Sequence, residues 1–216
     1  IESVWWALSE LNKKELIYEG VRVLAYCSRC ETPIANSEIA MDNSYKDITD
    51  ISVYVKFELI DEPNTFLLAW TTTPWTLPGN FALAANPEFN YVKVKIGESF
   101  YILAKERLSA IKDEHEIVEE NVKIIGKSYK PLFDYFINHD LANKENAWKV
   151  YGAKYVTADA GTGIVHTAPG YGEEDMELAK IENIPFAHHV LNDGTFAETV
   201  RDFIGLPVKP KSTEKD

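Results

Sequence analysis

Residues 69–80 read AWTTTPWTLPGN, and this stretch decides how we interpret the chain. The apolar run FLLAW that leads into it predicts a β-strand, because aromatic and aliphatic residues suit a half-buried pleated surface. Two prolines then end the strand, since proline cannot donate a hydrogen bond to a ladder. We therefore expect Thr71, Thr72 and Thr73 at the mouth of a strand, with hydroxyls alternating between its faces. Such hydroxyls could bind a polar substrate or orient a water, or they could belong to an ordinary threonine-rich strand.

A second informative stretch, GTGIVHTAPGYGEED, lies at residues 161–175. Its IV pair predicts a short buried strand that ends at His166, and the PG pair predicts a turn. A helix is expected at residues 173–181, with Asp175 in its first turn, where the helix dipole favours a carboxylate. Both polar residues therefore have a purely structural explanation. The GTG triplet is weak evidence for phosphate binding, because the full dinucleotide fingerprint is absent.

Together the two stretches resemble the editing (connective peptide) domain of isoleucyl-tRNA synthetase, within the class I aminoacyl-tRNA synthetase family. The resemblance rests on TTTPWTLP and on GTGIVHTAPG with ED just after it. In the sister enzymes for valine and leucine, the third threonine is typically arginine and the second motif lacks the HTAP form. Thr73 and His166 therefore favour the isoleucine enzyme. The resemblance continues through SVWWAL and EGVRV near the start and through DGTF and DFIGL near the end.

The pattern of apolar residues predicts an α+β fold around a closed or nearly closed barrel. The resemblance implies the same class, a mixed β-barrel with a few peripheral helices. We expect a helical lead-in from the synthetic domain at residues 1–20, the editing domain at 21–207 and a polar tail at 208–216. Residues 51–59 alternate cleanly between apolar and polar, as in a half-buried strand.

Other expected elements are helices at residues 3–16 and 104–112, and strands at 21–26, 91–96, 100–103, 122–125, 148–151 and 155–165.

Composition limits the class of protein. The 216 residues include 45% hydrophobic residues and carry a formal net charge of −12. The size suffices for one domain with a real core, and the charge disfavours strong nonspecific binding to nucleic acid. No apolar run approaches the length of a membrane span, and no secretory signal is visible. The two cysteines fit a reducing compartment, so we expect a cytoplasmic protein with no membrane partner.

The resemblance implies a hydrolase that clears mischarged valine from tRNA(Ile), and by extension valyl-adenylate, through attack of water on the ester. Asp175 would pair with the α-ammonium of the amino acid, and His166 would form a wall that excludes isoleucine. The threonines would orient the ester, the water or the adenosine. The expected partners are the valine-carrying 3′ end of tRNA(Ile), valyl-adenylate and the remainder of the synthetase. The predicted catalytic residues are Thr72, Thr73, His166 and Asp175, and the predicted substrate-binding residues are Trp70, Thr71, Trp75, Asn80, His166 and Asp175.

No cofactor is expected in this chain. Cys27 and Cys30 form a CxxC half-site for zinc, and the resemblance implies that ATP and zinc belong to the full-length enzyme. Neither synthetase signature motif, HIGH or KMSKS, occurs, so both ends are expected to be cuts and the chain alone is not expected to activate an amino acid. Three alternatives stay open: a noncatalytic tRNA-binding module, the editing domain of a valyl or leucyl relative, and a metallohydrolase using His166 and Asp175.

Overall fold

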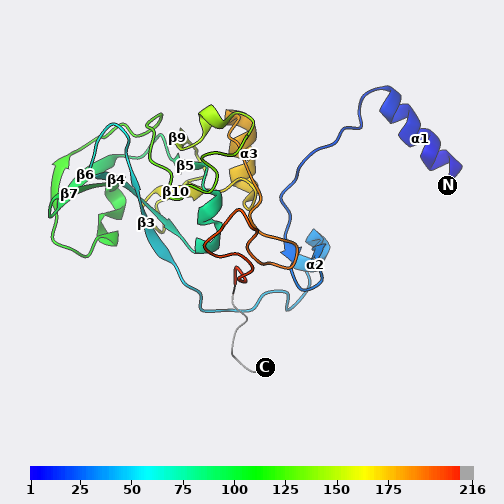
Figure 1. Cartoon of the computed structure of the whole chain (residues 1–216), viewed down its shortest axis with the longest axis horizontal. Helices are drawn as coiled ribbons and strands as arrows, with labels where there is room; N and C mark the ends of the chain where they lie inside the picture. Colours follow the sequence, from blue (N-terminus) through cyan, green and yellow to red (C-terminus); the bar gives the residue numbers. More distant parts are fainter. Residues whose placement is uncertain (210–216) are drawn as a thin grey trace.

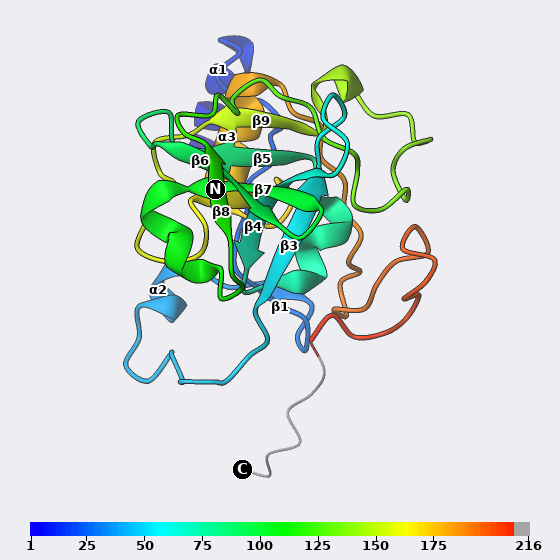
Figure 2. The same cartoon turned by 90° about the vertical axis from the view of Figure 1, so that its left-hand side faces the viewer.

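The computed structural model describes residues 1–209, so residues 210–216 of the predicted polar tail lie outside it. Its main feature is an eight-stranded mixed sheet, shown in Figures 1 and 2. The strands of this sheet are β3 (Val53–Glu58), β4 (Thr65–Thr71), β5 (Ala82–Ala85), β6 (Tyr91–Ile96), β7 (Ser99–Ala104), β8 (Glu116–Glu119), β9 (Lys149–Gly152) and β10 (Ile164–Thr167).

The remaining elements surround this sheet or precede it. They are the helices α1 (Glu2–Lys13), α2 (Asn36–Ile39) and α3 (Glu173–Glu182), the 3-10 helices η1 (Pro74–Gly79), η2 (Lys105–Ala110) and η3 (Lys144–Asn146), and the hairpin strands β1 (Tyr26–Cys27) and β2 (Thr32–Pro33).

Strand β4 organises the sheet, because it pairs with three other strands. It runs antiparallel to β3 along one edge, and along the other edge it pairs in parallel first with β7 and then with β10. From β10 the sheet continues through β5 to β9. Isolated bridges from Leu59 to Tyr129 and from Ser128 to Lys149 then join the end of β3 to β9. The sheet therefore curls into a nearly closed barrel, which confirms the predicted α+β class.

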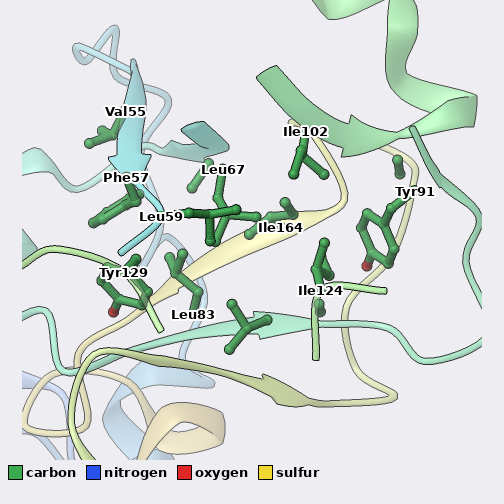
Figure 3. Close-up of a cluster of buried hydrophobic side chains, with 14 of the residues drawn as sticks. Val55, Phe57, Leu59, Leu67, Leu83, Tyr91, Ile102, Ile124, Tyr129 and Ile164 are labelled. Atoms are coloured by element: carbon green, nitrogen blue, oxygen red, sulfur yellow. The ribbon is translucent and has the colours of Figure 1, made fainter. Parts of the chain in front are cut away.

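The hydrophobic core fills the inside of this barrel. Figure 3 shows side chains from β3, β4, β5, β7 and β10 converging there. Phe57, Leu67, Leu83, Ile102 and Ile164 are each at most 1% exposed. Burial of such a side chain contributes roughly 1.5–3 kcal/mol relative to exposure. The alternation predicted for residues 51–59 holds from Val53 onward. Val53, Val55 and Phe57 are buried or half-buried, and the residues between them, Tyr54 and Lys56, are exposed.

The outer face of the sheet is covered at its two ends and open between them. Beneath β5, β9 and β10, a second apolar cluster includes Leu178 and Ala179 of α3. Over β6 and β7, Leu108 and Ile111 in and just after η2 pack on a third cluster. In the middle of this face, no outward-facing residue of β3 or β4 belongs to either cluster within residues 1–209.

Some predicted elements were wrong, and local geometry explains why. The expected strand at 155–165 is reduced to β10, because Gly161 and Gly163 have φ values of +69° and +76° that no strand accommodates. The expected strand at 122–125 buries Val122 and Ile124 but forms no ladder, and β8 pairs with β6 instead. The expected helix at 104–112 is the 3-10 helix η2.

The region before β3 contributes little to the core. Helix α1 buries no residue, and an extended segment separates it from the sheet in Figure 1. The expected strand at 21–26 is limited to the short strand β1, because the preceding residues have no strand partner. Among residues 1–209, no helix has the length and apolar character needed to cross a membrane.

Candidate active site

A cavity of about 310 Å³ opens where β4, β10 and the start of α3 meet. It lies at the border between the open part of the outer sheet face and the part that α3 covers. Segments from both sequence motifs form its walls, although roughly ninety positions separate them. The lining residues are Trp70, Thr71, Thr72, Thr73, Thr76, Val165, His166, Ala168, Tyr171, Gly172, Glu174 and Asp175.

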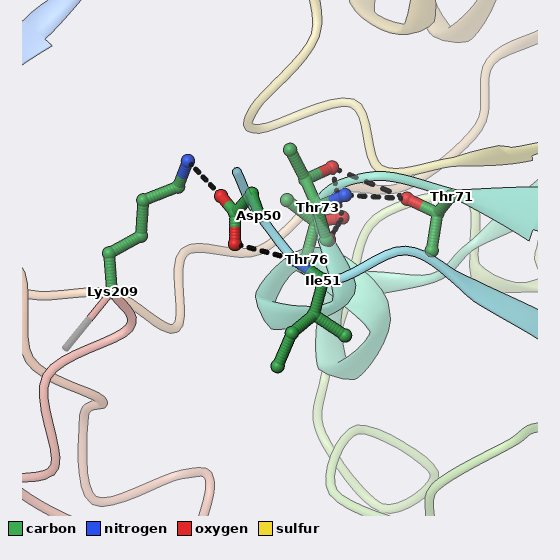
Figure 4. Close-up of polar contacts among 6 residues, drawn as sticks. All are labelled: Asp50, Ile51, Thr71, Thr73, Thr76 and Lys209. Atoms are coloured by element: carbon green, nitrogen blue, oxygen red, sulfur yellow. Dashed lines mark hydrogen bonds and ion pairs between the residues drawn. The ribbon is translucent and has the colours of Figure 1, made fainter. Parts of the chain in front are cut away.

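The threonines form a linked set at the end of β4. The backbone N–H of Thr73 donates to Thr71 Oγ1 at 3.1 Å, and the two hydroxyl oxygens lie 3.3 Å apart. Proline at the next position starts η1, which turns the chain back so that Thr76 Oγ1 donates to the Thr73 carbonyl at 2.8 Å. Figure 4 shows these contacts beside the ion pair between Asp50 and Lys209. Thr72 is exposed at the cavity mouth.

His166 is held between two fixed hydrogen-bonding partners. Asn80 Nδ2 lies 2.8 Å from Nδ1 of the ring, and Thr76 Oγ1 lies 3.0 Å from Nε2. Because the amide nitrogen is a donor, Nδ1 must accept, so we assign the proton to Nε2, which donates to Thr76. Tyr129 donates its hydroxyl proton to Asn80 Oδ1 at 2.7 Å and thereby fixes the amide orientation. Both ring nitrogens of His166 are therefore occupied.

The same surroundings keep His166 neutral. The side chain is buried, and burial lowers its pKa to about 3, with a smaller contribution from the nearby His189. An imidazole with this pKa and no free lone pair is unsuited to removing a proton near neutral pH. His166 presents a rigid, uncharged surface to the cavity.

Asp175 is the half-buried carboxylate of the site. It lies in the first turn of α3, and its Oδ2 accepts the backbone N–H of Ala168 at 2.8 Å. Burial raises its pKa to about 6, against the lowering effect of that hydrogen bond. The neighbouring Gly172 leaves room for the carboxylate, because a Cβ there would lie 2.8 Å from Oδ2. At neutral pH the carboxylate is mostly ionised, and a cationic ligand would stabilise that form.

The predicted residues divide into three groups. Six of them line the cavity together: Trp70, Thr71, Thr72, Thr73, His166 and Asp175. Asn80 lies behind His166 and acts through it. Trp75 is not among the lining residues and packs edge-on against Tyr171, with ring centroids 5.3 Å apart.

Sequence reasoning missed three residues that shape the site. Thr76 was within the first motif and could have been selected with the other threonines. Tyr171 lines the cavity, and its hydroxyl accepts the backbone N–H groups of His189 and Val190. Tyr129, which orients Asn80, is distant from both motifs and had no signal in the sequence.

The cysteines supply an incomplete metal site. Cys27 and Cys30 lie in the β1–β2 hairpin, and hydrogen bonding from the Cys30 backbone lowers the pKa of the Cys27 thiol. Tetrahedral zinc needs four donors. Over residues 1–209 no group of three or more His, Cys, Asp or Glu side chains could hold a metal ion. The hairpin therefore fits half of a zinc site.

Comparison with known proteins gives consistent matches over nearly the whole chain. The chain is 44% identical over 212 residues to an isoleucine–tRNA ligase of Clostridium tetani, and the match covers 97% of this chain and 20% of that protein. It is 41% identical over 230 residues to a probable cytoplasmic isoleucine–tRNA ligase of Dictyostelium discoideum, covering 100% of this chain and 21% of that protein. The chain thus spans about a fifth of the length of these curated relatives.

Among solved structures, the crystal structure of GlLeuRS-CP1 matches with a TM-score of 0.49 and 17% identity, over 60% of this chain and 58% of that chain. The family model for tRNA synthetases class I (I, L, M and V) matches residues 1–164, well over half of the sequence. On that match, the chain belongs to the class I tRNA synthetases for isoleucine, leucine, methionine and valine.

Proposed function

We propose that this chain is the editing domain of an isoleucine–tRNA ligase and hydrolyses the ester that joins misplaced valine to the 3′-terminal adenosine of tRNA(Ile). The carrying observation is the cavity in which one half-buried carboxylate, Asp175, lies with the threonine cluster and a neutral His166. Sequence identity to isoleucine–tRNA ligases supports the choice of amino acid. Hydrolysis of valyl-adenylate in the same cavity extends the proposal.

The need for such a site follows from the energetics of selection. A pocket built for isoleucine rejects valine only through one missing methylene, about 1–3 kcal/mol, and isoleucyl-tRNA synthetases are the established example of this limit. A second cavity that admits valine and excludes isoleucine multiplies the selectivity. Excluding isoleucine needs a rigid side chain in the cavity wall. The ring of His166, which is hydrogen-bonded to both Asn80 and Thr76, meets this need.

Asp175 binds the α-ammonium of the amino acid in this proposal. A charge-assisted hydrogen bond from an ammonium to a carboxylate contributes about 1.5–3 kcal/mol. The ammonium also favours the ionised carboxylate, which burial alone disfavours. The ester carbonyl is thereby placed near the end of β4, where the hydroxyls of Thr72 and Thr73 orient the attacking water.

No protein nucleophile is needed, because an ester on a ribose is already activated. The ribose hydroxyl next to the ester and the threonine hydroxyls can position one water within reach of the carbonyl. Both nitrogens of His166 are occupied, so the water is not deprotonated by the imidazole. Activation of the amino acid with ATP belongs to other parts of a longer, cytoplasmic synthetase, as do the second half of the zinc site and most contacts with tRNA.

The metallohydrolase alternative is less well supported. His166 could bind a metal only after losing its hydrogen bond to Asn80 or Thr76. In the part of the chain that the structure describes, no third donor joins His166 and Asp175. A noncatalytic RNA-binding module would account for the hydrogen bond from Ala168 to Asp175, but not for the convergence of that carboxylate, the threonines and His166 on one cavity.

The deciding experiment is single-turnover hydrolysis of tRNA(Ile) charged with valine or with isoleucine. We expect this chain to release valine faster than isoleucine. The Asp175→Asn variant should lose roughly ten-fold to a hundred-fold in valine release, because the ammonium anchor is gone. The matched control is Glu173→Gln, which removes an exposed carboxylate two positions earlier in the same turn. Equal rates in the wild type and Asp175→Asn would remove the carboxylate from the reaction.

A further inference from the structure

The open part of the outer sheet face is lined with aromatic side chains. We define the aromatic strip as Tyr54, Lys56, Phe66, Trp70 and Tyr101. Cross-strand register places them on one face, because Tyr54 lies opposite Trp70 in the β3–β4 pair and Phe66 lies opposite Tyr101 in the β4–β7 pair. Directly opposite residues in adjacent strands point to the same side of a sheet.

The strip is ordered by contacts among its own members. The rings of Phe66 and Tyr101 stack with centroids 5.7 Å apart and planes 28° apart. The ammonium of Lys56 lies 5.3 Å from the Phe66 centroid and 5.6 Å from the Tyr101 centroid. Lys56 forms no ion pair with any carboxylate of residues 1–209. The strip thus presents flat rings and one uncompensated positive charge on an acidic protein.

The strip is continuous with the cavity. Trp70 belongs to both, and from it the strip runs back along β4 to Phe66 over about 13 Å, taking about 3.3 Å per residue. This length accommodates more than one stacked base. At the far end, Glu58 lies opposite Phe66, but it is paired with Lys130 at 2.6 Å, so its charge is compensated.

A second cation lies near the cavity end of the strip. Arg107 Nε donates to the Gly161 carbonyl at 2.9 Å. A Cβ on Gly161 would lie 3.0 Å from the Trp70 ring, so this loop lies directly against the indole. The guanidinium therefore lies on the loop that supports Trp70.

We infer that the aromatic strip binds the single-stranded 3′ end of the acceptor RNA, stacking the bases that precede the terminal adenosine while the aminoacyl group enters the cavity. This inference rests on the proposed function. Rings that stack bases beside a cation that meets the phosphate backbone are the general means of holding single-stranded nucleic acid. Tyr101 packs at the border of the cluster that Leu108 and Ile111 cover and is half-buried. The strip residues on β3 and β4 belong to neither the α3 cluster nor the η2 cluster, which leaves Tyr54 and Lys56 exposed and the rings of Phe66 and Trp70 partly accessible. Tyr54 is 51% exposed.

The test compares two probes whose only difference is the preceding nucleotides. One is adenosine carrying valine through a non-hydrolysable 3′ amide. The other is a ribotetranucleotide that ends in the same valyl-amide adenosine. Affinity of the 216-residue chain for each probe is measured at several salt concentrations. The ratio of the two affinities reports the contribution of the strip, whereas the first probe alone reports the cavity.

Tyr54→Ala and Lys56→Ala are the informative variants, because both side chains are exposed and their loss does not disturb the core. The matched control is Lys95→Ala on β6, an exposed lysine on the opposite sheet face from Tyr101. We expect the tetranucleotide's advantage to fall about ten-fold in Tyr54→Ala, as for a lost stacking partner. In Lys56→Ala, the slope of log affinity against log salt concentration for the tetranucleotide should become shallower by about one. Lys95→Ala should keep both values.

The outcomes are separable. A tetranucleotide that binds no more tightly than the mononucleoside, or an advantage that survives both strip variants, would overturn the strip while leaving the cavity intact. Failure of the mononucleoside to bind, with no valine release from charged tRNA, would instead contradict the proposed function. An equal loss in Lys95→Ala would show that only bulk charge matters and would also refute the strip.

Discussion

At the scale of single residues, the ionised form of Asp175 that the proposed reaction needs is the form that lowers the stability of the folded chain. Its pKa is about 6 in the folded chain against 3.8 for an ordinary aspartate, so folding favours the protonated form. The wild type should therefore lose stability, relative to Asp175→Asn, as pH rises from about 4 to about 6. The full difference, about 3 kcal/mol, should appear above pH 6. Urea unfolding of both chains from pH 4 to pH 8 measures it, and parallel curves across that range would contradict the burial of an ionised group.

His166 determines selectivity in the proposed reaction. His166→Ala should let the chain hydrolyse isoleucyl-tRNA(Ile), because removal of the imidazole leaves ample room for one extra methylene. The variant should also lose about 1–3 kcal/mol of stability, since Thr76 and Asn80 each lose a buried partner. Deacylation of both esters is the measurement, with His115→Ala as the control. Loss of both activities together would identify His166 as a base, and continued rejection of isoleucine would place the sieve elsewhere.

At the scale of elements, Gly163 sets the start of β10. Its φ is +76°, and a Cβ would lie 2.4 Å from the Ala104 Cβ at the end of β7. We expect Gly163→Ala to cost about 3 kcal/mol or more, from backbone strain and a clash between strands. Gly97→Ala is the control, because its φ is +59° but nothing lies within 4 Å, so only about 1 kcal/mol is expected. Thermal unfolding of both variants compares them, and equal losses would show that the contact with β7 is unimportant.

The elements also show what the sequence could predict. Strand β3 and the β6–β7 hairpin were predicted because a period of two survives in their side chains. β10 was overestimated, because the turn geometry of Gly161 and Gly163 is invisible to an apolar count. Both motifs were located by resemblance, but the hydrogen bonds that fix His166 were not. Those bonds link residues 86 and 90 positions apart, and no local pattern encodes such a pairing.

At the scale of the whole molecule, the barrel is independent of the N-terminal helix. Helix α1 buries no residue, and Trp5 and Trp6 are each 68% exposed. A chain that lacks residues 1–20 should therefore keep the urea midpoint of the complete chain and gain solubility, because apolar surface is removed. Paired urea titrations provide the measurement. A clear fall in the midpoint would show that the helix stabilises the barrel after all.

The neutral imidazole has a consequence for how accuracy responds to the cell. The residue that would define the size limit of the cavity titrates near pH 3, and the residue that would capture the amino acid titrates near pH 6. Mild acidification would therefore slow error correction by protonating the empty carboxylate, but it would leave the shape of the barrier unchanged. The rate of valine release would thus depend on pH in this range, whereas the rejection of isoleucine would not. A cell under acid stress would remove mistakes more slowly, without beginning to destroy its correctly charged tRNA.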